Sequence, residues 1–373
     1  MTIFAKLDPM KQRIHRRKLI KAIGVAAGAV VVMPGWANII IPKQPEKLGV
    51  ALVGLGYYSK DLLAPALQLT SHCKLTGIVT GSPEKIPVWQ KRYGIKDMNV
   101  YNYENMSQIA DNPDIDVIYI VLPTGLHSRY GVKAADTGKH VWCEKPMAKT
   151  QVECQMLIDA CRKNKVKLSI GYRMHHEPNT QTIMKYANTK PFGRIVSGKA
   201  EAGYFDGRSN HWKQNKALGG GAMYDMGVYA LNAARYSTGT EPIGVTARHE
   251  TTRPDIYHEV DETTYFDLEF PDNTTMQCIT SLGKGMNELK LNCQNGWYGL
   301  QPFQAYSGIK GEASNGYRFD KRIPNQQAKQ MDDDALAILK NTDVLVPGEE
   351  GQRDIRIVEA IYQSAKQGRR VAL

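Results

Sequence analysis

The chain has 373 residues, 42% of them hydrophobic and 23% charged, which allows two domains and a large buried core. Its formal net charge is +11, but residues 1–37 hold seven bases and one acid, so that segment carries about half of the excess. The remaining Lys and Arg are interspersed with acids rather than gathered in a stripe, which argues against nucleic-acid binding.

Residues 1–37 have the pattern of a targeting segment. A basic stretch at 15–21 contains the pair Arg16-Arg17, an apolar run follows at 22–33, and small residues flank Trp36 where a signal peptidase would cut. The paired arginines favour the twin-arginine export route to the periplasm. The apolar run is too short to span a bilayer comfortably, so a membrane anchor is the weaker alternative and no stable span should remain after cleavage. Residues 38–47 follow as a linker or arm.

The next part of the chain alternates between predicted strands and helices. Apolar runs at 48–53, 75–80, 117–122 and 140–143 predict buried strands, with helical stretches between them. A helix at 151–163 and a strand at 167–170 complete the unit. Strands that alternate with helices predict an α/β domain over 48–170, with a parallel sheet and right-handed crossovers.

From residue 171 onward the pattern changes. Longer strands with alternating side chains are predicted at 195–205, 243–251, 262–270, 275–280 and 289–293, with one helix at 221–236 between them. Such strands favour an α+β domain over 171–373 with a large open, mostly antiparallel sheet. We expect a closing helix at 354–367 to pack back on the first domain.

A glycine motif follows the first predicted strand. Gly54 permits a tight turn, Gly56 lets the backbone approach a pyrophosphate, and Tyr57 and Tyr58 lead into a helix whose N-terminus favours anions. Ser59 replaces the third glycine, so the helix should sit slightly further from the strand. An ordinary glycine turn is the alternative, but a strand before the motif and a helix after it favour a dinucleotide-binding Rossmann domain.

The end of the second predicted strand indicates which dinucleotide binds. Enzymes that use NAD place an acid there to bind the ribose hydroxyls. Here Thr80-Gly81-Ser82 follows the strand, and Ser82 and Lys85 offer a hydroxyl and a positive charge. Glu84, the nearest acid, fits a solvated turn. The loop therefore favours NADP over NAD.

Two further motifs point to a family. Glu144-Lys145-Pro146 follows the fourth predicted strand, and Asp225-x-x-x-Tyr229 lies on the predicted helix of the second domain. Together with the glycine motif they resemble the Gfo/Idh/MocA oxidoreductases, and within that family the glucose–fructose oxidoreductase branch. The resemblance implies an NAD(P)-dependent enzyme that acts on a small-molecule sugar, with the second domain's sheet forming a homodimer or homotetramer.

The resemblance also implies a catalytic group made of Lys145, Asp225 and Tyr229. Oxidation of a sugar alcohol needs a base for the hydroxyl proton, and Tyr229 is the candidate. An unperturbed phenol has a pKa of about 10, and the nearby ammonium of Lys145 would favour the phenolate. Asp225 lies four residues before Tyr229, on the same helix face, and can bind sugar hydroxyls. The alternatives are a surface lysine, a helix-stabilising carboxylate and a core tyrosine.

Further predicted contacts lie on the loops around this group. His127 either contacts the cofactor or caps a helix, and Tyr172 and Arg173 are also plausible sugar contacts. The predicted sugar-binding residues are Lys145, Arg208, Trp212, Asp225 and Tyr229. The predicted cofactor-binding residues are Gly54, Gly56, Tyr57, Tyr58, Ser82, Lys85, Leu122, Pro123, His127, Glu144, Lys145, Tyr172 and Arg173.

No metal site is predicted. The six cysteines form no C-x-x-C pair, and His175-His176-Glu177 are consecutive residues that would point apart in a strand.

The leading hypothesis is an exported sugar oxidoreductase that retains NADP and passes hydride between two sugars. The alternatives are an ordinary NAD(P)-dependent sugar or polyol dehydrogenase, an NAD-assisted glycoside hydrolase of the same fold, and a non-catalytic sugar-binding protein.

Overall fold

A six-stranded parallel sheet forms from the first part of the described chain. The computed structural model describes residues 47–373, so the predicted targeting segment and all but the last residue of the predicted linker lie outside it. The strands are ordered β3-β2-β1-β4-β5-β6, the arrangement of a dinucleotide-binding Rossmann sheet. Their bounds are β1 (Leu48–Val53), β2 (Cys73–Val79), β3 (Val100–Tyr101), β4 (Val117–Ile120), β5 (His140–Cys143) and β6 (Leu168–Ile170).

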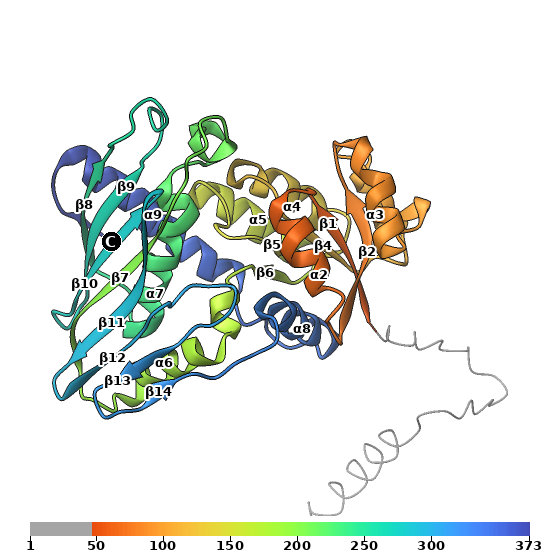
Figure 1. Cartoon of the computed structure of the whole chain (residues 1–373). Coiled ribbons are helices and arrows are strands. Elements are labelled where there is room, and N and C mark those ends of the chain that lie inside the picture. The colour runs from red at the N-terminus through yellow and green to blue at the C-terminus, as the bar shows by residue number, and fades with distance from the viewer. Residues whose placement is uncertain (1–46) are drawn as a thin grey trace, which may run out of the picture. The chain divides into compact units, whose positions relative to one another are not determined.

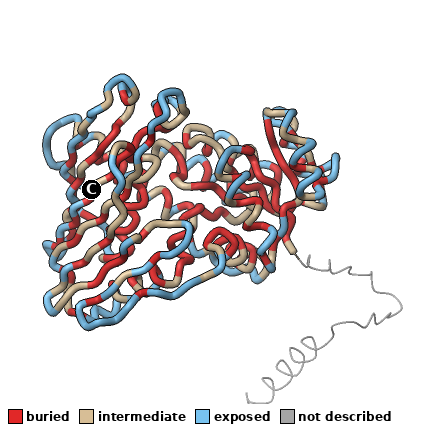
Figure 2. The backbone as a smooth tube through the Cα atoms, in the orientation of Figure 1, coloured by how far each residue is buried: buried red, intermediate tan, exposed pale blue. Residues whose placement is uncertain are grey.

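Helices cover both faces of this sheet, which explains why every residue of β1 and β4 is buried. On one face lie α4 (His127–Ala135) and α5 (Gln151–Lys163). On the other lie α2 (Ala64–Ala66), α3 (Ile86–Tyr93) and α8 (Gln326–Leu339). Figure 2 shows the resulting buried layer.

Helix α8 was not predicted, and it joins a domain far from it in sequence. Ala328, Met331 and Ala335 pack into the same core as the residues of β1 and β2. The Asp332 carboxylate accepts hydrogen bonds from the backbone of residues 71 and 72, and Ser169 donates to Asp334 at 2.7 Å. The first domain therefore includes α8, although the sequence analysis assigned residues 171–373 to the second domain.

A nine-stranded mixed sheet forms the second domain, in the order β14-β13-β12-β11-β7-β10-β9-β8-β15. Its neighbouring strands are antiparallel except β7 and β10, which are parallel. The predicted strands are β7 (Ile195–Phe205), β8 (Gly244–Glu250), β9 (Thr263–Glu269), β10 (Thr275–Ser281) and β11 (Gly283–Cys293). The unpredicted ones are β12 (Gly296–Leu300), β13 (Gly311–Ala313), β14 (Arg318–Phe319) and β15 (Val371–Ala372).

Three helices lie on one side of this sheet and connect it to the first domain (Figure 1). Helix α7 (Val228–Thr238) packs on β7 and β10, and α6 (Pro178–Thr189) packs on α7. The closing helix α9 (Gly348–Gln367) begins six residues before the predicted start and contacts α5 and β6 as well as β8. None of the helices in residues 47–373 has both the length and the apolar character needed to cross a membrane.

Candidate active site

The glycine loop after β1 has the predicted backbone. Gly54 has a φ of +92°, and a Cβ there would lie 2.4 Å from the carbonyl oxygen of Val121, so only glycine fits. A Cβ on Gly56 would meet nothing within 4 Å, which leaves open space beside the exposed loop. The Ser59 hydroxyl is buried and donates to the Gly54 carbonyl at 2.6 Å, so the residue in the third glycine's place ties the loop together.

The residues after β2 place a positive charge at this loop. Lys85 donates from Nζ to the carbonyl of Leu55, between the two glycines, at 3.2 Å. Ser82 is partly exposed, Glu84 is exposed, and Tyr57 is 65% exposed. Open backbone at Gly56 and a lysine in place of an acid fit a phosphate-bearing dinucleotide.

His127 connects the loop after β4 to the turn that follows Lys145. Its Nε2 lies 2.7 Å from the carbonyl oxygen of Leu122, next to Pro123, and its Nδ1 lies 2.8 Å from the carbonyl oxygen of Pro146. The ring is buried, and this burial lowers its pKa. Because both nitrogens face backbone carbonyls, the ring braces the two loops, and its contact with the cofactor stays a prediction.

Three more predicted cofactor contacts have side chains inside the protein. Glu144 accepts from the Tyr119 hydroxyl at 2.6 Å, and the Tyr172 ring lies 6.1 Å from that of His175. Arg173 is 1% exposed and donates to the side chains of Gln304 and Gln326 and to the carbonyl of Ala305. These contacts do not support direct binding of the cofactor by the three side chains.

The buried Glu144 carboxyl should make stability depend on pH. Burial raises its pKa from 4.5 to about 7. Between these two pH values the carboxyl is therefore protonated in the folded protein and ionised in the unfolded chain. The contribution of this proton to the free energy of unfolding is complete below pH 4.5 and is lost as the pH rises to 7, a decrease of about 3 kcal/mol at most. Urea unfolding at pH 5 and pH 8 should therefore show a smaller decline in the free energy of unfolding for Glu144→Gln than for the wild type. Parallel declines would contradict the assignment.

The three residues of the predicted catalytic group meet where the two domains face each other. Lys145 follows β5, Asp225 lies on a π-helical turn (Met223–Gly227) and Tyr229 lies at the start of α7. The Lys145 Nζ donates to the Asp225 carbonyl at 2.7 Å and lies 4.3 Å from the centroid of the Tyr229 ring. The lysine therefore sits over the face of the tyrosine as a cation–π pair.

Two residues that the sequence did not reveal hold the Asp225 carboxylate. Its Oδ2 accepts from Lys213 Nζ at 2.7 Å and from the Tyr204 hydroxyl at 2.9 Å. Burial alone would raise its pKa, but Lys213 and Lys145 lower the pKa below its usual value. Neither residue belongs to a motif, since Lys213 lies in a short 3-10 helix (Trp212–Gln214) and Tyr204 near the end of β7.

The predicted sugar contact Arg208 is bound elsewhere. Its Nε and Nη2 donate to Asp206 at 2.8 and 2.6 Å, and its Nη1 lies 3.1 Å from Nε2 of His211. The guanidinium is therefore committed, and Lys213 is the basic residue of this loop that reaches Asp225. Trp212 is partly buried, with the Lys213 ammonium 5.9 Å from its ring.

An aromatic residue from the second domain completes the surroundings. Tyr306 is 44% exposed, and its ring lies 6.2 Å from that of Tyr58. The Arg173 guanidinium lies 4.9 Å from the Tyr306 ring and 5.4 Å from the Tyr229 ring. Arg173 thus holds the loop that carries Tyr306 against the group around Tyr229, and sequence spacing gave no sign of this loop.

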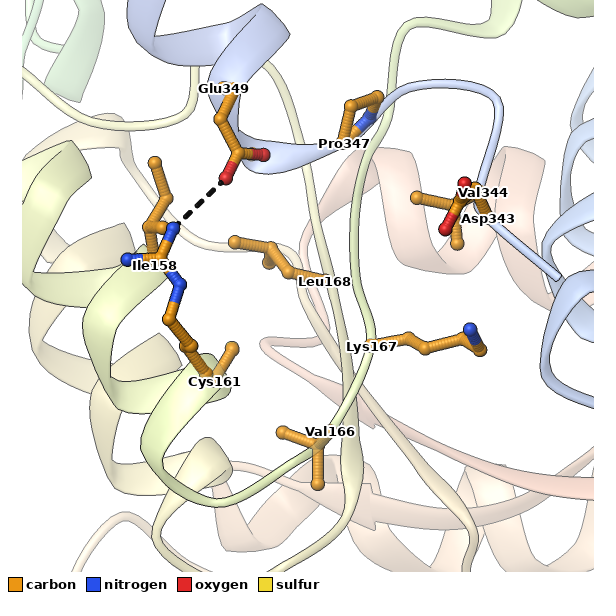
Figure 3. A pocket seen from close by; sticks show the side chains of 11 residues that line it. Ile158, Cys161, Val166, Lys167, Leu168, Asp343, Val344, Pro347 and Glu349 are labelled. Carbon is orange, nitrogen blue, oxygen red and sulfur yellow. Dashed lines mark hydrogen bonds and ion pairs between the residues drawn. The ribbon is translucent and has the colours of Figure 1, made fainter. Parts of the chain in front are cut away.

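A cavity of about 340 Å³ lies elsewhere, between the end of α5, β6 and the start of α9 (Figure 3). Leu168 and Pro347 line it, Arg162 and Glu349 form an ion pair beside it, and it includes none of the predicted site residues.

Residues 173–176 form a short 3-10 helix and not the expected strand. The side chain of His175 is hydrogen-bonded to Asn232, and that of His176 to Asp333. In the described part of the chain, no group of three or more His, Cys, Asp or Glu is placed to hold a metal ion.

Comparison with known protein families agrees with this arrangement. Residues 48–172 match the profile of an oxidoreductase family with an NAD-binding Rossmann fold. Residues 180–298 match the GFO/IDH/MocA C-terminal domain, and residues 303–373 match an oxidoreductase-family C-terminal alpha/beta domain.

Individual relatives include enzymes of sugar oxidation. The chain is 24% identical to a D-xylose 1-dehydrogenase [NADP(+)] of Haloarcula marismortui, over 89% of this chain and 94% of the relative. It is 27% identical to a levoglucosan dehydrogenase of Pseudarthrobacter phenanthrenivorans, over 52% of each. Among solved structures, an aldose–aldose oxidoreductase from Caulobacter crescentus complexed with glycerol is 36% identical with a TM-score of 0.85, over 88% of this chain and 100% of that one.

Proposed function

The chain belongs to the Gfo/Idh/MocA family as a nicotinamide-dependent sugar oxidoreductase, and from this we propose that it is an exported enzyme that keeps NADP bound and passes hydride between two sugars. The observation that carries the proposal is the position of Lys145, which reaches from the dinucleotide domain to Tyr229 and to the backbone of Asp225. A site that oxidises an alcohol needs a proton acceptor and a charge beside the dinucleotide, and these residues provide both.

The glycine loop supports NADP as the cofactor. Gly54 and Gly56 would hold the pyrophosphate, and Ser82 and Lys85 would meet the additional phosphate of NADP. The contact of Lys85 with the Leu55 carbonyl keeps this charge at the loop. A related D-xylose 1-dehydrogenase is described as NADP-dependent. We therefore place NADP before NAD.

The side chains divide the chemistry between them. When bound, the nicotinamide accepts or returns a hydride. Tyr229 takes the proton of the sugar hydroxyl as that carbon is oxidised and returns it when the second sugar is reduced. Lys145 lies over the Tyr229 ring and favours the negative charge that develops on it. The ionised Asp225 accepts a hydrogen bond from a second sugar hydroxyl and orients the sugar.

The proposal that the protein is exported is consistent with the proposal that it retains its cofactor. Free nicotinamide cofactor is scarce outside the cytoplasm, so an exported enzyme benefits from carrying its own, and the twin-arginine route transports folded proteins. A structural relative that carries the name aldose–aldose oxidoreductase supports two sugars as the reaction partners. We also propose a homodimer or homotetramer through the face of the large sheet opposite α7, where the partly exposed Tyr265, Ile279 and Trp297 lie.

The test uses protein purified without added cofactor. Addition of D-glucose or D-xylose should produce the reduced-nicotinamide absorbance at about 340 nm, and addition of a ketose or a second aldose should reverse it. Nucleotide released on denaturation should be NADP. If denaturation releases no nucleotide and turnover needs added NADP or NAD, the protein is an ordinary dehydrogenase. Release of nitrophenol from a nitrophenyl glycoside would instead favour the glycoside hydrolase.

A further inference from the structure

The two oxygens of the Asp225 carboxylate are bound unequally. Oδ2 accepts from both Lys213 and Tyr204, whereas Oδ1 accepts a hydrogen bond from no described residue. The three buried carboxylates that form ion pairs in the described chain, by contrast, accept hydrogen bonds at both oxygens. Asp354 accepts from Arg235 on one oxygen and from Asn232 on the other. The carboxylates of Glu262 and Asp206 likewise accept hydrogen bonds on both oxygens.

The ammonium of Lys213 also has unused capacity. A lysine ammonium carries three N–H donors. Lys213 directs two of them to Asp225 Oδ2 and the Tyr204 hydroxyl, at 2.7 and 2.9 Å, and no described residue accepts the third. The pair therefore has one free acceptor, Asp225 Oδ1, and one free donor, the third N–H of Lys213.

This pair is partly open to solvent, unlike the buried pair of Arg235 and Asp354. The side chains of Lys213 and Asp225 are 19% and 13% exposed, whereas those of Arg235 and Asp354 are 4% and 0% exposed. The pair lies beside the catalytic group, because the backbone carbonyl of Asp225 accepts from Lys145 and the charge of Lys145 also lowers the pKa of the Asp225 carboxyl. A small polar molecule bound next to Lys145 and Tyr229 would thus meet the free donor and the free acceptor.

A hydroxyl is the group that satisfies both at once, since it donates one hydrogen bond and accepts others. We propose that Lys213 is a specificity-determining residue which, together with Asp225 Oδ1, binds the hydroxyl on the carbon next to the one oxidised. For an aldose oxidised at C1 this is the C2 hydroxyl, so the substrate class is 2-hydroxy aldoses and excludes 2-deoxy sugars. Tyr204 orients the ammonium. The inference rests on the proposed sugar oxidoreductase function.

The test compares a sugar with the analogue that lacks this hydroxyl. The wild type and Lys213→Met are assayed with the faster of D-glucose and D-xylose and with its 2-deoxy analogue. Wild-type kcat/KM should be at least about 100-fold lower for the 2-deoxy sugar, because the analogue leaves both polar groups unpaired. Lys213→Met should lose about 10- to 100-fold toward the parent sugar, through a charged hydrogen bond, and less than about threefold toward the 2-deoxy sugar.

Matched variants separate recognition from folding. Lys216→Met removes an exposed lysine from the same loop and should leave both sugars unaffected, and Lys213→Gln provides a neutral donor if the methionine variant does not fold. Equal losses toward both sugars, or no loss, would overturn the inference. The proposed function fails in a different way: the wild type itself would then reduce no bound or added nicotinamide with either parent sugar.

Discussion

Replacement of Lys145 by methionine is expected to lower kcat/KM for the sugar by about 10³-fold while the fold and the bound nucleotide remain. The ammonium is closer to the Tyr229 ring than the Arg173 guanidinium is, at 4.3 Å against 5.4 Å from the ring centroid, and it also fixes the Asp225 backbone. Methionine keeps the length of the side chain but provides neither charge nor donor. The effect should therefore fall on the proton-transfer step, with a smaller change in KM.

Rapid mixing of the cofactor-loaded variant with sugar measures that step directly, through the rate at which reduced nicotinamide appears. Lys163→Met is the control, because Lys163 is exposed at the end of α5, and it should react at the wild-type rate. Nucleotide content is measured after denaturation. A Lys145→Met protein that holds its nucleotide and reacts within tenfold of the wild type would refute the proposed role of the lysine.

Replacement of Tyr229 by phenylalanine should lower kcat by about 10²- to 10³-fold and change KM little. The ring would keep its cation–π contact with Lys145, since that contact involves the face of the ring and not the hydroxyl. The variant therefore removes the proton acceptor alone. The measurement is steady-state turnover together with the rate of the first half-reaction across pH 6 to about 10.

Tyr236→Phe offers a matched control, because Tyr236 lies further along the same helix α7 and is also buried. Loss of the Tyr236 hydroxyl should leave turnover close to that of the wild type. If Tyr229→Phe retained full turnover, another group would have to take the proton, and the assignment of Tyr229 as the acid/base would fail.

The first domain could be predicted largely from sequence because its signals are local. A strand buried on both faces appears as an apolar run, and the backbone needed at Gly54 restricts that position to glycine. Strand β3 was missed because two residues give no periodicity. Helix α8 was missed because its sequence is rich in Gln and Asp, and its apolar positions make sense only against a sheet made much earlier in the chain.

The residues of the candidate site likewise fall into those that a local sequence motif predicts and those that only the folded chain reveals. Lys145, Asp225 and Tyr229 carry recognisable spacing, and the structure brings them together. Lys213 and Arg208 are both basic residues of one loop, and sequence alone could not tell which of them reaches Asp225. Arg208, five residues before Lys213, is held by Asp206, and only the folded loop reveals this. His127 and Arg173 brace neighbouring loops through contacts that no sequence motif reveals, and their contact with the cofactor stays a prediction.

The position of α8 has a consequence for the order in which the protein can mature during synthesis. The ribosome makes the strands of the dinucleotide sheet first, but α2 and α3 cover only part of one face of β1 and β2 until residues 326–339 have emerged. Domains usually fold as units from the N-terminus during synthesis, yet here the first unit lacks part of its own core until nearly the whole chain is made. A fragment that stops at residue 170 should accordingly expose apolar surface and aggregate rather than bind nucleotide.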